Sequence, residues 1–340
     1  MTETLLTCGE PLCSTYDVAL LDLDGVVYRG PHAVPGAPEA LAKAAESGMR
    51  LAFVTNNAAR TPETVAEHLR ELGVAAQADQ VVTSAQAAAR LVAERVPQGS
   101  PVLVVGGEGL VNALRERGLV PVHSAKDEPV AVVQGFAPDV SWRLLAEGAY
   151  AVATGVPWIA SNVDMTIPTG RGIAPGNGTL VSAVGAATGR EPVVAGKPEL
   201  PLHAEALSRS GASRPLVVGD RLDTDIEGAV RAGTPSLLVL TGVTTPERLL
   251  AAPPGLRPSY LAEDLTGLLQ AHTAPRLTEA GAVLAGWRAE LTGGDVLTVR
   301  GSGDPIDALR VACAASWASS RRPHDVDAPP DAGLPQRLPG

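Results

Sequence analysis

VALLDLDGVVY, at residues 18–28, decides the fold, because four apolar residues are followed by two carboxylates and a glycine. A short apolar run that ends at a turn signal is typical of a buried strand in a parallel sheet. Ligands of open α/β sheets bind beyond the carboxyl ends of strands, so we expect Asp22 and Asp24 at the mouth of a site. Residues i and i+2 of an extended chain point the same way, and Gly25 lets backbone amides approach a bound group.

Two carboxylates this close repel each other unless a cation lies between them. Magnesium suits this place, because it is a hard cation that binds one or two carboxylates, several waters and a substrate phosphate. The metal would also keep Asp22 ionised and able to act as a nucleophile. The alternative is a strand that ends in a solvated turn, since the DxDG pattern also occurs by chance.

The length and composition predict more than one domain and little affinity for polyanions such as nucleic acid. With 340 residues we expect two domains and room for a small third. Hydrophobic residues make up 45% and aromatic residues only 3%, so the cores must consist mainly of Ala, Val and Leu. A net charge of −10 argues against nucleic acid and anionic membrane surfaces as partners. A small anionic substrate stays open, because a metal and local cations would decide its binding.

The cysteines and the N-terminus predict a cytoplasmic protein. Cys8, Cys13 and Cys313 form no CxxC motif and no even set, which favours free thiols in a reducing compartment. Residues 1–14 lack the basic and apolar regions of a signal peptide, and no apolar run reaches about 18 residues.

Short apolar runs alternate with amphipathic stretches from Asp17 onward, which is typical of βαβ units. We expect a strand over 50–55 and a helix over 38–48, and Thr61 followed by Pro62 opens another helix. A second α/β series follows from about residue 80, with helices over 84–96, 108–117 and 141–154 and strands over 102–105, 130–134 and 157–160. The first series then resumes, with strands over 216–219 and 236–240, a helix over 223–232 and a last strand and helix within 261–271.

The chain changes character beyond Thr273. Helices over 282–290 and 308–319, around a short strand over 296–299, would form a small appendage. From residue 320 the chain is rich in Pro, Asp and Arg, and we expect disorder there.

Polar residues follow the predicted strand over 50–55. The hydroxyl of Thr55 and the amides of Asn56 and Asn57 can hold phosphate oxygens by neutral donors. The alternative is an ordinary helix cap or turn cluster.

Lys197 follows an apolar run and is flanked by glycine and proline. Its ammonium is a point charge that suits phosphate and could offset the crowded aspartates. A surface lysine is the alternative.

GDRLDTD, at residues 219–225, follows another apolar run. Asp220 could complete the protein ligands of the metal, and Asp225, one turn on, could support that site through its neighbours. An acidic helix N-terminus, favoured by the helix dipole, explains Asp223 and Asp225 but explains Asp220 poorly.

The ordered set DLDGV, TNN, GKP and GDRLDTD resembles the haloacid dehalogenase superfamily of phosphatases over residues 17–271. The insert between the second and third motifs resembles the class with an α/β cap, the NagD-type group. The resemblance implies an α/β fold with a Rossmann-like core, a doubly wound parallel sheet and an inserted cap domain. We therefore expect the core at 14–80 and 193–272, the cap at 81–192, a C-terminal segment at 273–319 and a disordered tail at 320–340.

The resemblance also implies roles for these residues. Asp22 would be the nucleophile that forms an aspartyl-phosphate, and Asp24 the general acid and base. Magnesium would bind Asp22, the backbone carbonyl of Asp24, and Asp220. The phosphoryl group would be bound by Thr55, Asn56, Asn57 and Lys197.

The stretch ASNVDMTIPT, at residues 160–169, resembles the substrate-specificity loop of that class, which makes Asn162 and Asp164 candidates for substrate contact. Pyridoxal-phosphate phosphatases carry a histidine where this chain has Ile167, which argues against an aromatic cofactor phosphate. Arg171 is a candidate contact for the leaving group, with a solvated arginine as the alternative.

The appended segment is similar to that of the actinobacterial glycerol-3-phosphate phosphatases, in which the extra piece resembles part of an acetyltransferase fold. Residues 300–303, RGSG, faintly resemble an acetyl-CoA pyrophosphate loop. The segment is too short to transfer an acetyl group, so we expect a structural or regulatory role.

The resulting prediction is a magnesium-dependent phosphatase of small phosphate esters, with glycerol 3-phosphate first among them. Sugar, nucleotide or pyridoxal phosphates, a phosphotransferase or mutase reaction, and a catalytically lapsed phosphate-binding protein are the alternatives. Caps of this class often mediate dimers, so a homodimer is also expected.

Overall fold

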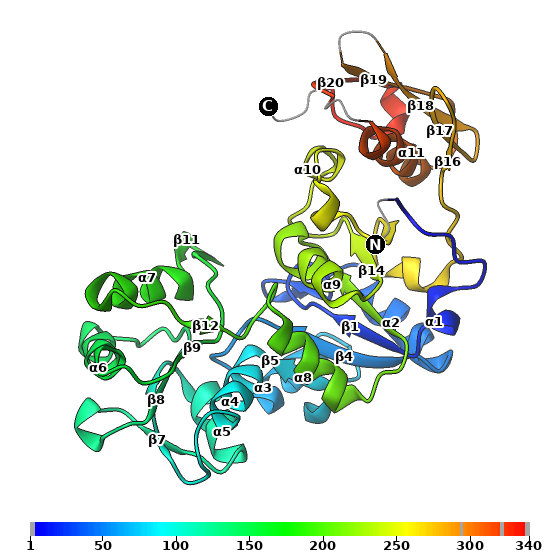
Figure 1. Cartoon of the computed structure of the whole chain (residues 1–340). Helices are drawn as coiled ribbons and strands as arrows, with labels where there is room; N and C mark the ends of the chain where they lie inside the picture. The colour runs from blue at the N-terminus through cyan, green and yellow to red at the C-terminus, as the bar shows by residue number, and fades with distance from the viewer. Residues whose placement is uncertain (1–3, 293–294, 320–322, 337–340) are drawn as a thin grey trace. The chain divides into compact units, whose positions relative to one another are not determined.

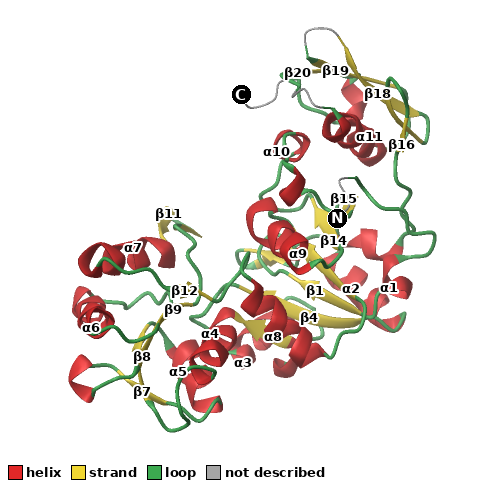
Figure 2. Ribbon diagram, viewed as in Figure 1, coloured by secondary structure: helices red, strands yellow, loops and turns green. Residues whose placement is uncertain are grey.

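The computed structural model describes residues 4–292, 295–319 and 323–336 and divides the chain into two compact units. The first unit joins residues 1–51 to residues 212–340, and the second spans residues 52–211. The boundary falls inside strand β4 (Arg50–Thr55). Strands and helices alternate along both units, as an α/β fold requires (Figures 1 and 2).

The first unit is organised around parallel strands that run in the order β15, β14, β13, β1. Every residue of β1 and β14 is buried, and all of them except Ser236 are apolar, as expected for strands covered on both faces. Leu21 of β1 pairs with Val218 of β13, so these two strands end side by side. Their bounds are β1 (Val18–Leu21), β13 (Pro215–Gly219), β14 (Ser236–Val239) and β15 (Tyr260–Ala262).

Helices and short turns connect these strands. The helix expected over 223–232 begins as a π-helical turn, Leu222–Ile226, and continues as α9 (Glu227–Ala232). The helix expected within 261–271 is present as a 3₁₀ helix over Leu265–Leu269. The other elements are α1 (Leu12–Thr15), α2 (Ala37–Glu46), α10 (Pro246–Leu250) and the small hairpin β2 (Tyr28–Arg29) and β3 (His32–Ala33).

The second unit contains the parallel pair β4 and β5 (Val81–Thr83) and a separate five-stranded parallel sheet. The order of that sheet is β12 (Val193–Val194), β9 (Trp158–Ala160), β8 (Ala131–Gln134), β6 (Pro101–Val105) and β7 (Val120–Val122). Its helices are α3 (Pro62–Glu71), α4 (Ser84–Ala93), α5 (Glu108–Glu116), α6 (Trp142–Ala153), α7 (Asn177–Thr188) and α8 (Leu200–Ser210). Thr61 caps α3 as predicted, since its hydroxyl accepts the Thr64 N–H at 3.3 Å.

The C-terminal part of the first unit is a five-stranded sheet packed on one helix. The helix expected over 282–290 is wrong, because these residues form the hairpin of β17 and β18. Ala285 and Gly286 make its turn, both with positive φ (46° and 86°), as a type I′ turn requires. The elements are β16 (Arg276–Leu277), β17 (Gly281–Leu284), β18 (Trp287–Thr292), β19 (Val296–Arg300), α11 (Pro305–Ala318) and β20 (Asp325–Asp327).

The disorder expected from residue 320 onward is wrong for the described residues 323–336. Val326 of β20 is buried, and β20 pairs in parallel with β19. The polar composition suggested that this segment could not offset the entropy lost on ordering. Pairing with β19 and burial of Val326 offset that loss. Residues 320–322 and 337–340 lie outside the described residues.

Helix α11 attaches this sheet to the rest of the first unit (Figure 1). The Trp317 indole N–H donates to the Leu249 carbonyl at 3.1 Å, and the Ser316 hydroxyl donates to Leu250 at 3.0 Å. Both acceptors belong to α10, so the two parts share hydrogen bonds as well as apolar packing.

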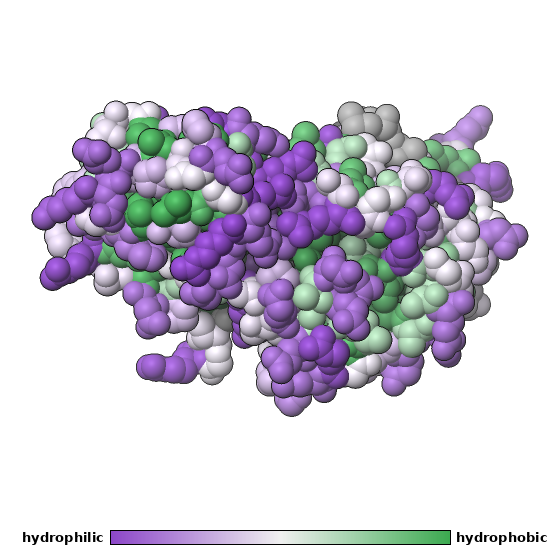
Figure 3. Space-filling view, turned by 90° about the horizontal axis from the view of Figure 1, so that it is seen from below, coloured by the Kyte–Doolittle hydropathy of each residue, from purple (hydrophilic) through white to green (hydrophobic). Residues whose placement is uncertain are grey.

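Hydrophilic side chains cover most of the face in Figure 3, with smaller apolar areas between them. Within the described residues, no helix combines the length and apolar character needed to cross a membrane.

A buried ion cluster ties α8 to α4 and to the end of α5. The Glu205 carboxylate, 1% exposed, accepts from Arg209 at 2.6 Å, Arg117 at 2.7 Å and Arg90 at 3.4 Å. The three guanidinium groups keep about a third of their surface exposed, so water can still reach them.

Glu205→Gln should destabilise the protein by about 2 kcal/mol, because it removes the shared counter-charge while the partly exposed arginines regain some water. Urea denaturation followed by circular dichroism would measure the shift. The matched control is Glu94→Gln, which removes a 51% exposed partner of Arg90 and should cost about 0.5 kcal/mol or less. Equal effects of the two substitutions would contradict the assigned role of Glu205.

His272 links the 3₁₀ helix Leu265–Leu269 to α11. The imidazole is 3% exposed, Nε2 lies 2.8 Å from the Gly267 carbonyl, and Nδ1 lies 3.3 Å from Arg310. Since arginine can only donate, Nδ1 accepts and Nε2 carries the proton. Burial, aided by the Arg310 charge, lowers the pKa of His272 despite the opposing Gly267 hydrogen bond.

This environment predicts a loss of stability on acidification. The folded protein favours neutral His272, so its contribution is complete above the unfolded pKa of about 6.5 and falls as the pH drops toward the lowered pKa. Urea midpoints at about pH 7.5 and 5.5 should therefore differ more in the wild type than in His272→Gln. An equal difference in both proteins would show that His272 does not contribute.

Candidate active site

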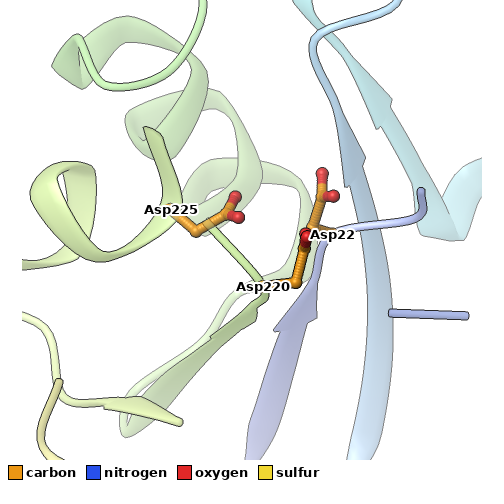
Figure 4. A group of neighbouring side chains, drawn as sticks. All are labelled: Asp22, Asp220 and Asp225. Atoms are coloured by element: carbon orange, nitrogen blue, oxygen red, sulfur yellow. The ribbon is translucent and has the colours of Figure 1, made fainter. Parts of the chain in front are cut away.

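Three aspartates gather where β1 and β13 end. Asp22 directly follows β1, Asp220 directly follows β13, and Asp225 lies in the π-helical turn after it. Each offers a carboxylate oxygen, and these oxygens lie within 4.8 Å of one another (Figure 4). Asp220 and Asp225 are buried, and Asp22 is partly buried. The parallel register of the two strands therefore produces a compact acidic cluster.

The loop after β14 holds Asp220 in place. The Val243 N–H donates to Asp220 Oδ2 at 2.6 Å, and the Thr244 N–H donates to its backbone carbonyl at 3.1 Å. A Cβ on Gly242 would lie 1.9 Å from Asp220 Oδ2, and one on Gly25 would lie 2.6 Å from the same atom. Only glycine fits at either position, and Gly25 also needs its φ of +88°.

Asp225 is positioned by the π-helical turn, a feature that occurs often at functional sites. Its Oδ2 accepts the Arg221 N–H at 3.2 Å. A Cβ on Gly219 would lie 2.2 Å from the Asp225 Cβ, so the strand end and the turn touch directly. Asp223, by contrast, points to solvent and pairs with Arg221 at 2.9 Å.

The donor set fits a hard divalent cation. Three carboxylates this close repel one another, and a cation that takes oxygen ligands relieves that repulsion. Magnesium and calcium both take carboxylate oxygens, and neither requires nitrogen or sulfur ligands. Asp22, Asp220 and Asp225 are thus the side chains that could hold such an ion.

Asp24 lies outside this cluster. The residue is exposed, yet the surrounding protein atoms desolvate its carboxyl group enough to raise its pKa. A raised pKa leaves more of the protonated form at a given pH, which suits a group that donates a proton.

In the second unit, Asn56 joins the other two motifs. Its Oδ1 accepts the Lys197 N–H at 2.8 Å, and its Nδ2 donates to the Lys197 carbonyl at 3.2 Å. Nδ2 also lies 3.3 Å from Asp164 Oδ2. TNN and GKP, which are 141 residues apart, are therefore held together by one side chain.

Thr55 and Asn57 shape the turn around Asn56. The Thr55 hydroxyl accepts the Asn57 N–H at 3.1 Å, and Asn57 Oδ1 accepts the Ala59 N–H at 2.8 Å. Both oxygens therefore accept backbone N–H groups of the turn, as the alternative of an ordinary turn cluster predicts. The hydroxyl of Thr55 still has its proton to donate.

The stretch at residues 160–169 contacts Asn56 as well. Asn162 is buried, and its Nδ2 donates to the Asn56 carbonyl at 2.8 Å while its Oδ1 accepts the Asp164 N–H at 3.2 Å. Asn177 donates to the Asn162 carbonyl at 2.7 Å, a contact that the sequence analysis missed. The signal was present, because Asn177 stands between two glycines that approach the same loop.

Ile167 and Arg171 lie elsewhere on the loop. Ile167 belongs to β10 (Thr166–Thr169), and Arg171 belongs to the turn that leads to β11 (Gly172–Pro175). Arg171 is exposed, and its backbone N–H donates to the Thr169 hydroxyl at 3.3 Å.

Comparison with known proteins places most of the chain. A family model of haloacid dehalogenase-like hydrolases matches residues 19–120, and a second HAD-hydrolase-like model matches residues 194–268. A model of a GCN5-related N-acetyltransferase-like domain matches residues 285–333.

Individual relatives are similar over most of their length. The chain is 47% identical to a D-glycerol 3-phosphate phosphatase of Mycobacterium tuberculosis, over 87% of this chain and 82% of that protein. An acid sugar phosphatase of Staphylococcus saprophyticus is 38% identical over 75% of this chain and 97% of its own. A crystal structure of the mycobacterial glycerol phosphate phosphatase with magnesium aligns with a TM-score of 0.86 and 42% identity, covering 95% of this chain and 97% of that one.

Gly242→Ala should weaken Mg²⁺ binding by about tenfold or more, because its Cβ would displace the Asp220 carboxylate. Isothermal titration with Mg²⁺ after EDTA treatment and dialysis would measure the effect. Gly255→Ala is the control, since a Cβ there meets no atom within 4 Å. Unchanged affinity in Gly242→Ala would remove Asp220 from the metal site.

Proposed function

The chain belongs to the haloacid dehalogenase-like hydrolase family, and from this premise we propose that it is a magnesium-dependent phosphatase that hydrolyses glycerol 3-phosphate. The observation that carries the proposal is the cluster of Asp22, Asp220 and Asp225, with Asp24 two residues beyond Asp22. The 47% identity to the mycobacterial glycerol 3-phosphate phosphatase supports this substrate, and the magnesium in its crystal structure supports the metal.

Asp22 is the proposed nucleophile. One of its carboxylate oxygens attacks the phosphorus, the bond to the ester oxygen breaks, and Asp24 donates a proton to the departing alkoxide. Asp24, now a carboxylate, takes a proton from water, whose oxygen attacks the aspartyl-phosphate. Inorganic phosphate leaves and Asp22 is regenerated. The raised pKa of Asp24 supports its assignment as the acid of the first step.

The metal would be held by Asp22, Asp220 and the backbone carbonyl of Asp24. When bound, it neutralises phosphoryl oxygens and keeps the nucleophile ionised. Asp225 is proposed to support the metal site without binding the metal. Its carboxylate lies beside that of Asp220 and is held in place by the Arg221 N–H.

The remaining site residues would bind the phosphoryl group. We assign direct contacts to the Lys197 ammonium and the Thr55 hydroxyl, with Asn57 shaping the turn. Asn56 is proposed to position Lys197, because both polar atoms of its side chain are bonded to the Lys197 backbone. In the cap loop, Asn162 and Asp164 orient Asn56, while Ile167 and Arg171 are the candidates for the organic part of the substrate.

The cap domain is proposed to span residues 81–192 and the core residues 14–80 and 193–272. We propose that the protein acts in the cytoplasm on free phosphate esters, without nucleic acid, and that it forms a homodimer through the cap. Size-exclusion chromatography with light scattering would test the dimer.

Asp22→Asn should abolish phosphate release from glycerol 3-phosphate, and Asp24→Asn should reduce turnover by roughly 10²–10⁴-fold. Release of inorganic phosphate with Mg²⁺ would be followed colorimetrically. Asp223→Asn lies in the same family motif, points to solvent and should keep the wild-type rate. Retained hydrolysis in Asp22→Asn would contradict the assignment of Asp22 as the nucleophile.

A substrate panel tests the rest of the proposal. Glycerol 3-phosphate should have a higher kcat/KM than pyridoxal phosphate, because Ile167 stands where pyridoxal-phosphate phosphatases carry a histidine. It should also have a higher kcat/KM than a sugar phosphate, because the chain is 47% identical to a glycerol 3-phosphate phosphatase and 38% identical to an acid sugar phosphatase. A sugar phosphate with the highest kcat/KM would favour the second candidate, an acid sugar phosphatase. Transfer of the phosphoryl group to an added alcohol, without free phosphate, would indicate a phosphotransferase.

A further inference from the structure

The C-terminal sheet carries a cavity that the phosphatase site does not use. Its volume is about 630 Å³, and its lining residues all fall between Thr273 and Gly301. Pockets for small molecules commonly measure about 300–1,000 Å³. The cavity shares no residue with the aspartate cluster or with the motifs assigned to phosphate binding.

Three arginines line this cavity in one row across the sheet: Arg276 on β16, Arg288 on β18 and Arg300 on β19. Arg276 pairs with Val283 of β17, Val283 pairs with Arg288, and Arg288 pairs with Arg300. Directly opposed residues of antiparallel strands point to the same face. The row therefore places three guanidinium groups on one side of the sheet.

This side is the one that does not contact α11. Trp287, Ala289 and Val299 alternate with the arginines along β18 and β19, and these three are buried. All three arginines are exposed. The sheet thus buries its apolar face and presents the arginines outward.

Two of the three charges in this row have no ion-pair partner within the described residues. Arg300 pairs with Asp327, but Arg276 and Arg288 make no ion pair and no side-chain hydrogen bond within the described residues. Glu290, the next residue of β18 on the same side, forms no ion pair with Arg288, and no Asp or Glu is among the residues that line the cavity. Like charges directly opposed on neighbouring strands are destabilising.

Two glycines keep the space beside the arginines open. Gly286 and Gly301 both line the cavity, and a Cβ on Gly301 would lie 2.3 Å from the Gly286 carbonyl oxygen. Both have positive φ, so neither position readily accepts another residue. Neither of these two positions therefore contributes a side chain to the cavity.

We propose that this arginine cavity binds a small anion with two or more phosphate groups. Guanidinium groups bind phosphate through two parallel hydrogen bonds, which makes arginine the preferred partner of such anions. The row crosses three strand spacings, about 14 Å in all, so an extended anion can contact more of the arginines than a single phosphate can. The site is separate from phosphatase activity, and its ligand balances the unpaired charges of Arg276 and Arg288.

Isothermal titration of the full chain with inorganic pyrophosphate, in EDTA and without magnesium, tests the proposal. The wild type should bind pyrophosphate more tightly than orthophosphate, and binding should weaken when salt is raised from about 0.05 M to about 0.5 M. The double variant Arg276→Gln/Arg288→Gln should bind about 100-fold more weakly, since each charge-assisted contact is worth about tenfold.

Arg143→Gln is the matched control, because it removes an exposed arginine on α6, outside the cavity, and should bind pyrophosphate as the wild type does. All variants should keep wild-type phosphatase activity, which shows that they are folded. Absence of pyrophosphate binding in the wild type would overturn the proposal. So would equal binding by the double variant, which would place the anion elsewhere.

Discussion

Repulsion among three carboxylates is the constraint on which the first unit depends. Oxygens of Asp22, Asp220 and Asp225 lie within 4.8 Å of one another, and two of these residues are buried. Such a group is costly without a counter-ion, because a low local dielectric strengthens repulsion as much as attraction. The parallel register of β1 and β13 enforces the proximity, so a divalent cation bound by these carboxylates would stabilise the fold as well as complete the proposed site.

Glycines make this crowding possible. Gly25 and Gly242 lie against the Asp220 carboxylate, and Gly219 lies against Asp225. A Cβ at any of these three positions would clash with the aspartate beside it. The Val243 N–H then reaches the Asp220 carboxylate at 2.6 Å. These glycines are therefore parts of the acidic site as well as turn residues, and the loop after β14 belongs to it although it carries no acidic side chain there.

Local patterns could be predicted from the sequence where one segment decides its own structure. The strand at 50–55 and the Thr61 cap needed only apolar spacing and a hydroxyl before proline. The contacts of Asn56 could not be predicted, since its partner Lys197 is 141 residues away. Residues 282–290 were misassigned because the spacing of their apolar residues suits both a helix and a strand. The positive φ of Ala285, which turns them into a hairpin, is rare outside glycine.

The two faces of the C-terminal sheet have different roles: one attaches the sheet to the rest of the first unit, and the other carries the proposed ligand site. Its apolar face packs on α11, and α11 in turn donates hydrogen bonds to carbonyls of α10 through Ser316 and Trp317. Stability of the attachment explains that face and the helix. It does not explain why Arg276 and Arg288, which form no ion pair within the described residues, line an open cavity on the opposite side that contains no acidic side chain. A row that costs stability, placed beside an open cavity, is better explained by an anionic ligand than by packing.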